Sequence, residues 1–289
     1  HWESYLWSPT GTSVVFGATE KPEKNERGIT RLRGLLDRMA GHRDMTSLHL
    51  VEVENGVRRR LTGGPVSASA VAFSPDGSRL LVTREIEDFS RRPYSRNELW
   101  ELDLGSGDAR KLRDFGWLGG VEYSPNGKRL LVQAGPSEFG ELGIAVDGEG
   151  PVNDFDGQLY IWDPESGDVD AISRSFDPAV TTARWSPHDG AITLLAIDGH
   201  RRSLFRFEPE HRVFAPIPTG IESVGAFDVA LRGSTVVAEG SSVWEPQRVV
   251  VAGRDGNPER VLIRPSADRF AAIRRGEVRQ WNFAASDGR

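Results

Sequence analysis

Short apolar runs separated by turn-forming residues recur along the chain. The clearest unit spans residues 71–82, where an aromatic residue, Ser-Pro-Asp-Gly and a run of Leu and Val follow one another. The same order returns at 121–132 and, more loosely, at 183–190, 5–11 and 227–237. Proline sets φ for the second position of a type I turn, Asp or Asn tolerates the third, and glycine takes a left-handed conformation next. Each unit therefore predicts two antiparallel strands joined by a tight turn.

Two further strands follow in each unit. The second strand is an unbroken apolar run, such as Leu80-Leu81-Val82, which is typical of a strand covered on both faces. Candidate third strands are residues 48–53, 99–104, 159–163, 204–207 and 248–251. Candidate fourth strands are residues 58–62, 109–112, 170–173 and 260–263. Four strands per roughly 40–50 residues, repeated in series, are typical of β-propeller blades.

We therefore predict an all-β fold, a β-propeller of four-stranded blades over residues 1–283. Five clear blades start near residues 5, 71, 121, 183 and 227. Residues 268–283 are expected to begin another, partial blade, and the whole would be part of a seven- or eight-bladed ring. The alternative is a pair of β-sandwiches, which is disfavoured because sandwiches do not repeat a turn motif at one place in each unit.

The extra residues of the longer units fall between the second and third strands. These inserts are residues 17–47 in blade one, 84–97 in blade two and 134–157 in blade three. Equivalent loops of a propeller emerge on one face, and insertions on one face usually mark the binding surface. The first insert also predicts a short amphipathic helix, because apolar residues recur at helical spacing: Ile29, Leu32, Leu36 and Met39.

Composition and charge exclude several classes of function. The net charge is −6 with no sustained basic run, which argues against nucleic-acid binding. The absence of cysteine excludes disulfides, thiolate metal sites and a cysteine nucleophile. No apolar run approaches the roughly 18–20 residues that span a bilayer. We therefore expect no nucleic-acid partner and no membrane span.

Catalytic and metal-binding motifs are not found. The chain has no Gly-x-Ser-x-Gly, no P-loop and no His-Glu-x-x-His, and its six histidines are scattered. Asn153, Asp154 and Asp156 do not follow the spaced oxygen-ligand pattern of a calcium loop. We therefore assign no catalytic residue, no metal site and no cofactor to this chain.

Charged residues of the inserts are the candidates for substrate gating or docking: Glu85, Glu87, Arg91, Arg92 and Glu138. A carboxylate there suits a peptide amino terminus, and an arginine suits a carboxylate or a carbonyl. The alternative is a solvated rim whose surface ion pairs contribute little.

The residues resemble those of a known family. The turn units are shared with many propellers, whereas the more specific matches are residues 29–33 (Ile-Thr-Arg-Leu-Arg), 48–53, 60–62, 241–247 (Ser-Ser-Val-Trp-Glu-Pro-Gln) and 276–289. Together they resemble the N-terminal β-propeller of the prolyl oligopeptidase family of serine peptidases, closest to its acylaminoacyl-peptidase and dipeptidyl-peptidase-like branch. No paired-glutamate motif of the dipeptidyl type is found, so the resemblance gives no support to amino-terminal selectivity.

The resemblance implies a role beside a catalytic domain. In that family an α/β-hydrolase domain carries the serine, aspartate and histidine, and the propeller covers the active site and restricts access to peptides. Residues 284–289 would begin the linker to that domain. The implied partners are a peptide substrate and the protein's own α/β-hydrolase domain, and the full-length protein would be a serine-type peptidase.

Other interpretations remain open at this point. The same repeats suit a non-enzymatic propeller for protein interaction, of the periplasmic translocation type. A carbohydrate-active propeller enzyme would need carboxylates that converge in the central channel. The chain begins at His1, so we expect a fragment or a processed product, and a ring cut before closure exposes strand edges that favour a homo-oligomer.

Overall fold

The computed structural model describes residues 2–21, 32, 34, 39, 41–90, 92–143, 153–253, 259–274, 276, 278–281 and 283. Blade one contains β1 (Trp2–Trp7), β2 (Ser13–Glu20), β3 (Met45–Glu52) and β4 (Arg58–Arg60). Blade two contains β5 (Ser69–Phe73), β6 (Arg79–Glu87), β7 (Ser95–Asp103) and β8 (Ala109–Phe115). Blade three contains β9 (Leu118–Tyr123), β10 (Leu130–Ala134), β11 (Gln158–Trp162) and β12 (Val169–Asp170).

The last two blades have the same strand order. Blade four contains β13 (Ala179–Trp185), β14 (Ile192–Asp198), β15 (Arg201–Glu208) and β16 (Val213–Ile217). Blade five contains β17 (Ser223–Val229), β18 (Val236–Ser241), β19 (Arg248–Val251) and β20 (Arg260–Ile263). Within each blade, neighbouring strands pair antiparallel in sequence order. The prediction of four-stranded blades is therefore confirmed.

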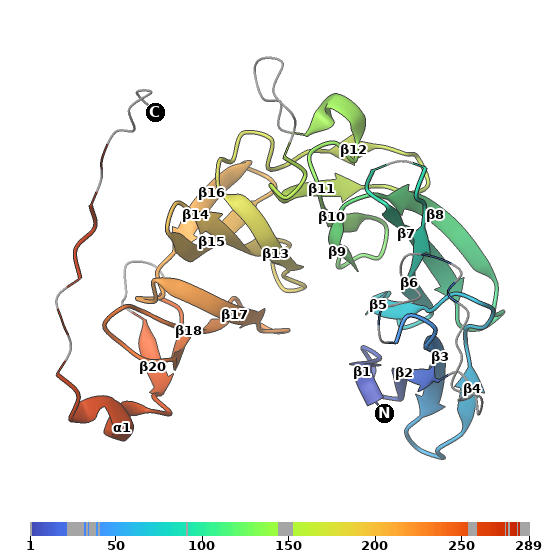
Figure 1. The fold of residues 1–289 in the computed structure, drawn as a ribbon, viewed down its shortest axis with the longest axis horizontal. Coiled ribbons are helices and arrows are strands. Elements are labelled where there is room, and N and C mark those ends of the chain that lie inside the picture. The colour runs from blue at the N-terminus through green and yellow to red at the C-terminus, as the bar shows by residue number, and fades with distance from the viewer. Residues whose placement is uncertain are drawn as a thin grey trace.

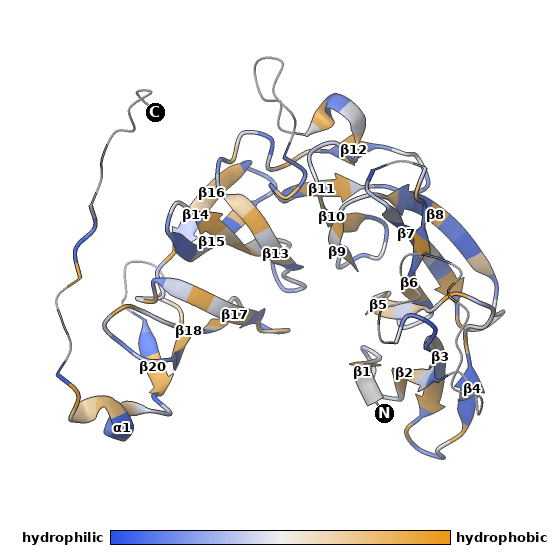
Figure 2. Cartoon of the chain, viewed as in Figure 1, coloured by the Kyte–Doolittle hydropathy of each residue, from blue (hydrophilic) through white to orange (hydrophobic). Residues whose placement is uncertain are grey.

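The blades stand side by side in an arc (Figure 1). The first strand of each blade lies on the inner side of this arc, and blades one and five form its two ends (Figure 1). The outer strands β4 and β8 are mostly hydrophilic (Figure 2), as expected for strands that face solvent. Among the described residues, no helix has the length and hydropathy that a bilayer-spanning segment requires.

The hydrophobic cores lie between blades. Side chains along the second strand point alternately to the two neighbouring blades. In β6, Leu80 and Val82 belong to the core shared with blade one, whereas Leu81 belongs to the core shared with blade three. All three side chains are buried, as the unbroken apolar run predicts. The other two cores join blade three to blade four and blade four to blade five.

The repeated turn has the geometry that its residues predict. In blade two, the Gly77 backbone N–H donates to the Ser74 carbonyl over 2.8 Å, and Gly77 has φ of 74°. The serine has a further role, because its buried hydroxyl donates to Asp76 Oδ1 at 2.5 Å and accepts from the Arg79 backbone N–H at 2.9 Å. The hydroxyl therefore joins the turn to the start of the following strand.

Two expectations about connections and ends change. Strands β6 and β7 stay paired up to Glu87 and Ser95, so the insert of blade two is residues 88–94 and not 84–97. Residues 267–271 form a short helix, α1 (Ala267–Ala271), and the described residues from 272 to 283 contain no strand. The helix expected between Ile29 and Met39 lies outside the described residues, apart from single exposed positions. The insert of blade three is confirmed between β10 and β11.

Candidate functional site

A cavity of about 490 Å³ lies where the inserts of blades two and three meet. The loop between β6 and β7, the start of β7, the end of β8 and the insert of blade three each supply part of its wall. The lining residues are Arg92, Pro93, Arg96, Asp114, Gly116, Trp117, Ser137, Glu138 and Asp154. The cavity therefore occupies the side of the molecule that the sequence predicts to be elaborated.

The structure brings together two of the five residues proposed for docking. Arg92 and Glu138 both line the cavity. Glu85 and Glu87 instead lie exposed on the extended end of β6, where the Glu87 carboxylate is 3.5 Å from His42 Nδ1. Arg91 lies outside the described residues. Strand pairing past residue 84 is the reason that the two glutamates are not part of the insert loop.

The Glu138 carboxylate is fixed by the connection between blades two and three. Its Oε1 accepts the backbone N–H of Trp117 over 2.6 Å. Burial raises the pKa of Glu138, the Trp117 and Gly116 N–H groups oppose this rise, and the nearby Asp154 carboxylate adds to it. A Cβ on Gly116 would lie 3.0 Å from Glu138 Oε1, so the glycine permits this close approach.

The insert of blade three is anchored to blade two by an arginine and an aromatic ring. Arg113 on β8 donates to the Glu138 carbonyl over 2.6 Å, and its guanidinium lies 4.6 Å from the centroid of the Phe139 ring. Phe139 is buried against Phe115 and Tyr160, with ring centroids at 5.8 and 4.7 Å. These contacts hold the cavity wall in place although it is a loop.

Two arginines line the cavity with few close partners. Arg96 Nη2 is 3.4 Å from Asp88 Oδ2, and its Nη1 is 3.9 Å from Asp114 Oδ2. Its Nε is buried and has no hydrogen-bond partner in the described part of the chain. Arg92 is exposed, and its Nε donates to the Tyr94 hydroxyl over 3.3 Å.

Aromatic rings flank this charged wall. Trp117 lines the cavity, and its ring contacts that of Phe155 at a centroid distance of 4.7 Å. Phe155 is 78% exposed, so its ring offers an open apolar surface beside the polar groups. The site therefore combines hydrogen-bond donors, carboxylates and an aromatic edge, which suits an amphipathic ligand such as a peptide.

Sequence reasoning did not find Arg96, Asp114 and Trp117. Arg96 and Asp114 lie on strands, and Trp117 lies in the short connection between two blades. Arg96 falls within the predicted insert 84–97 but is not singled out there, while Asp114 and Trp117 lie outside every predicted insert, so no spacing in the sequence relates these two to Glu138. Only the packing of blade three against blade two brings these segments together.

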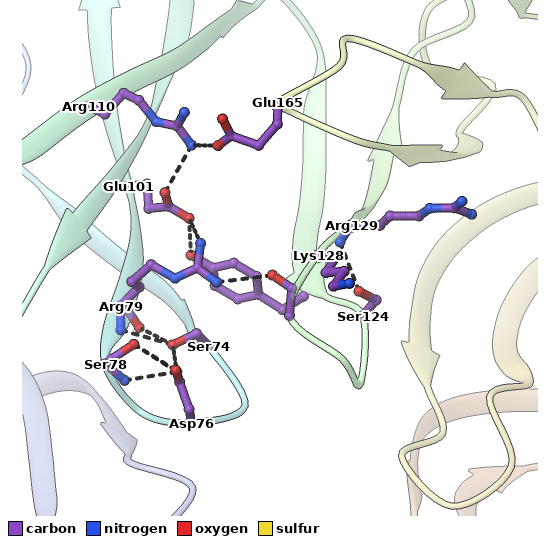
Figure 3. Close-up of polar contacts among 12 residues, drawn as sticks. Ser74, Asp76, Ser78, Arg79, Glu101, Arg110, Ser124, Lys128, Arg129 and Glu165 are labelled. Atoms are coloured by element: carbon purple, nitrogen blue, oxygen red, sulfur yellow. Dashed lines mark hydrogen bonds and ion pairs between the residues drawn. The ribbon is translucent and has the colours of Figure 1, made fainter.

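A second polar cluster lies on the opposite, turn side of the same two blades (Figure 3). The buried Glu101 carboxylate accepts from Arg79 at 2.9 Å, from Arg110 at 3.1 Å and from the Tyr123 hydroxyl at 2.7 Å. Arg79 also donates to the Gly127 carbonyl of blade three over 3.0 Å. Burial and the Glu101 carboxylate raise the pKa of Tyr123. Protein groups satisfy this cluster, so it joins the blades and leaves no open ligand site.

The inner side of the arc contains a smaller cavity of about 240 Å³. Glu122 supplies the one carboxylate among its lining residues. This carboxylate accepts the Trp185 backbone N–H and lies 3.5 Å from Arg184, while burial raises the pKa of Glu122. The described residues show no group of three His, Asp or Glu side chains that could hold a metal ion. Paired carboxylates of the kind that glycoside hydrolysis requires are therefore not found in this cavity.

Comparisons with known proteins define the fold. No protein-family model and no curated protein matches the chain. The acylaminoacyl peptidase of Pyrococcus horikoshii is similar with a TM-score of 0.70 and 15% identity, over 99% of this chain and 42% of that chain. The oligogalacturonate lyase of Vibrio parahaemolyticus has a TM-score of 0.61 and 15% identity, over 91% of this chain and 65% of that chain. TolB of Acinetobacter baumannii has a TM-score of 0.54 and 15% identity, over 75% of this chain and 48% of that chain.

These likenesses bear on architecture, because identities near 15% do not carry activity from one protein to another. The chain spans less than half of the length of the peptidase that it matches over almost all of its own residues. The resemblance to propellers of prolyl oligopeptidase-type peptidases is thus confirmed at the level of the fold. The chain is a β-propeller of four-stranded blades, similar in fold to part of an acylaminoacyl peptidase.

Proposed function

We propose that this chain is the propeller portion of a serine peptidase of the prolyl oligopeptidase type, and that it controls the access of peptides to an α/β-hydrolase active site. The observation that carries the proposal is the likeness to the acylaminoacyl peptidase, which extends over 99% of this chain. The stretch 276–289, which resembles the passage from propeller to hydrolase domain in that family, supports the same conclusion.

The cavity between blades two and three gives this role a physical basis. Its wall offers N–H donors from Arg92 and Arg96 and acceptors from Glu138 and Asp154, which are the groups that a peptide backbone and its ends require. A cavity of about 490 Å³ accommodates a short segment of extended chain and excludes a folded domain. In this proposal the propeller selects by size and hydrogen bonding, while bond cleavage takes place in the hydrolase domain.

Peptide hydrolysis by the full-length protein tests the proposal. We expect the protein to cleave peptidyl chromogenic substrates, and to lose this activity when the serine of a Gly-x-Ser-x-Gly motif beyond residue 289 is replaced by alanine. Residues 1–289 alone should show no hydrolysis, because no catalytic residue is assigned to them. A gene that encodes no such motif, or a full-length protein that cleaves no peptide, would contradict the proposal.

A second candidate is a non-enzymatic propeller for protein interaction, of the periplasmic translocation type. The likeness to TolB over 75% of this chain supports it. The two candidates differ in one measurable property, because only the first requires peptide hydrolysis by the full-length protein. A full-length protein without hydrolase activity that binds a protein partner through the inserts of blades two and three would favour the second candidate.

A further inference from the structure

We propose that the cavity between blades two and three binds a carboxylate group of a peptide, with Arg92 and Arg96 as the donors. This inference deepens the proposed function and rests on it. It specifies which peptides the site would prefer: those that present a carboxylate, either at the carboxyl terminus or on an Asp or Glu side chain.

The carboxylates in the wall already have protein partners. Glu138 Oε1 accepts a backbone N–H at 2.6 Å, and Asp154 Oδ1 accepts another at 3.2 Å. Asp114 Oδ1 is 2.7 Å from Lys111 Nζ. Because these carboxylates already have hydrogen-bond or ion-pair partners in the protein, they favour a positively charged ligand less strongly than their number suggests.

The arginines of the same wall are not satisfied in this way. The distances from Arg96 to Asp88 and Asp114 are 3.4 and 3.9 Å, whereas N–H···O hydrogen bonds measure about 2.7–3.2 Å. Its buried Nε has no hydrogen-bond partner among the described residues, which is uncommon for a buried donor. Arg92 uses Nε for Tyr94, and no hydrogen bond from its two terminal nitrogens is found in the described part of the chain.

On the turn side of the same blades, two arginines do have a close carboxylate partner. Arg79 and Arg110 both reach the Glu101 carboxylate, at 2.9 and 3.1 Å (Figure 3). That cluster is closed, because one carboxylate receives both guanidinium groups. The wall around Arg92 and Arg96 lacks an equivalent close acceptor among the described residues. A ligand carboxylate would supply it, since its two oxygens match the fork of a guanidinium group.

A peptide fits this site better than a small free anion. The cavity has a volume of about 490 Å³, which greatly exceeds that of one carboxylate group. The exposed Phe155 ring and the Trp117 ring form an aromatic edge beside the arginines, suited to the apolar atoms next to a peptide carboxylate. Charge recognition and aliphatic contact can therefore act together on one ligand.

Calorimetric titration of the full-length protein, treated with a serine-directed inhibitor to prevent turnover, tests the inference. The probes are acetyl-Ala-Ala-Ala with a free carboxyl terminus, the same peptide as its amide, and acetyl-Ala-Glu-Ala-amide beside acetyl-Ala-Gln-Ala-amide. We expect at least one carboxylate probe to bind about tenfold more tightly than its neutral partner, because a hydrogen bond to a charged group is stronger than one between neutral groups. The pair that shows the preference identifies the source of the carboxylate.

Substitutions then locate the preference. Arg92→Gln and Arg96→Gln should each reduce the preference for the carboxylate probe to about twofold or less. The control Arg129→Gln removes the same charge from an exposed position on the turn side, and this variant should keep the full preference. Arg92 is exposed, so its variant should fold even if the Arg96 variant is destabilised. Equal binding of the carboxylate and neutral probes, or a preference that survives in the double variant, would overturn the inference.

The two proposals fail in different ways. A protein that hydrolyses peptides but binds carboxylate and amide probes equally would retain the proposed function and lose this inference. A protein that shows the arginine-dependent preference but cleaves no peptide would retain the carboxylate site and lose the peptidase function.

Discussion

Blade three differs from blades four and five in the length of the connection between its second and third strands. In blade four, β14 and β15 are connected by residues 199 and 200 alone, and in blade five, β18 and β19 are connected by residues 242–247. In blade three, the connection between β10 and β11 spans residues 135–157. This long connection supplies Ser137, Glu138 and Asp154 to the cavity wall, while Arg96 and Asp114 come from strands β7 and β8.

The cores between these blades reflect the same difference. The core between blades four and five is largely aliphatic, with Leu195, Leu204, Ile221, Val224, Val236, Ala238 and Val250 buried. The core between blades two and three includes Phe139, which belongs to the insert itself. A backbone pair between Arg202 and Ser223 links blades four and five directly. A loop can thus form a stable cavity wall when one of its side chains is part of a core.

The largest expected effect comes from removing that side chain. Phe139→Ala should lower the free energy of unfolding by about 3 kcal/mol, because it leaves a cavity between Phe115 and Tyr160. Urea denaturation measures the loss. Amide hydrogen exchange should increase in β10 and β11, which pack beside Phe139, and stay unchanged in β18, which belongs to the separate core between blades four and five.

The matched control for this substitution is Phe155→Ala. Phe155 belongs to the same insert but is exposed, so its loss should change the free energy of unfolding by less than about 0.5 kcal/mol. Equal destabilisation by the two variants would contradict the view that Phe139 anchors the insert.

A smaller effect is expected at the turn side of blades two and three. Glu101→Gln should lower the free energy of unfolding by about 2 kcal/mol, because it removes the buried charge that receives Arg79, Arg110 and Tyr123. The partial exposure of both arginines limits the loss. The free energy of unfolding in urea checks this value.

An exposed ion pair provides the control for Glu101. Arg212 Nη1 lies 2.7 Å from Asp170 Oδ2, and both side chains are about half exposed. Arg212→Gln should therefore cost less than about 1 kcal/mol. If Arg212→Gln destabilised the protein as much as Glu101→Gln, burial would not be what distinguishes the two pairs.

The smallest effect concerns pH and compares the turns of blades two and three. A hydrogen bond from Ser74, with others from Ser78, lowers the pKa of Asp76 from 3.8 to about 2. A lowered pKa in the folded state stabilises the protein above the unfolded-state pKa, and this contribution is lost as the pH falls from about 4 to 2. Asp76→Asn should reduce the loss of stability between pH 4 and 2. The reduction in the free energy of unfolding that is lost should be less than about 1 kcal/mol, because the side chain is exposed.

Blade three already carries asparagine at the equivalent position, Asn126, whose Oδ1 accepts from Ser124 at 2.8 Å. The converse substitution Asn126→Asp should therefore steepen the loss of stability between pH 4 and 2. Stability curves at several pH values test both variants together. Parallel curves for the wild type and both variants would show that these turns do not contribute to acid sensitivity.

Much of the fold could be predicted from the sequence. The Ser-Pro-Asp-Gly turns, the buried second strands and the insert of blade three are all recognisable, because each depends on residues close together in the chain. Of the residues that line the cavity, Arg92 and Glu138 are expected from the position of the inserts, and their role in docking stays a prediction. Glu85 and Glu87 could not be placed, because strand pairing past residue 84 depends on hydrogen bonds to β7.

The repeating unit, its turn and the side of the propeller on which the longer connections lie follow from the amino-acid sequence alone, because local residue preferences act over a few positions. The tertiary structure decided which side chains meet across blades. Arg96, Asp114 and Trp117 line one cavity with Glu138 only because a shared core holds blade two against blade three, and packing of that kind depends on contacts between segments far apart in the chain.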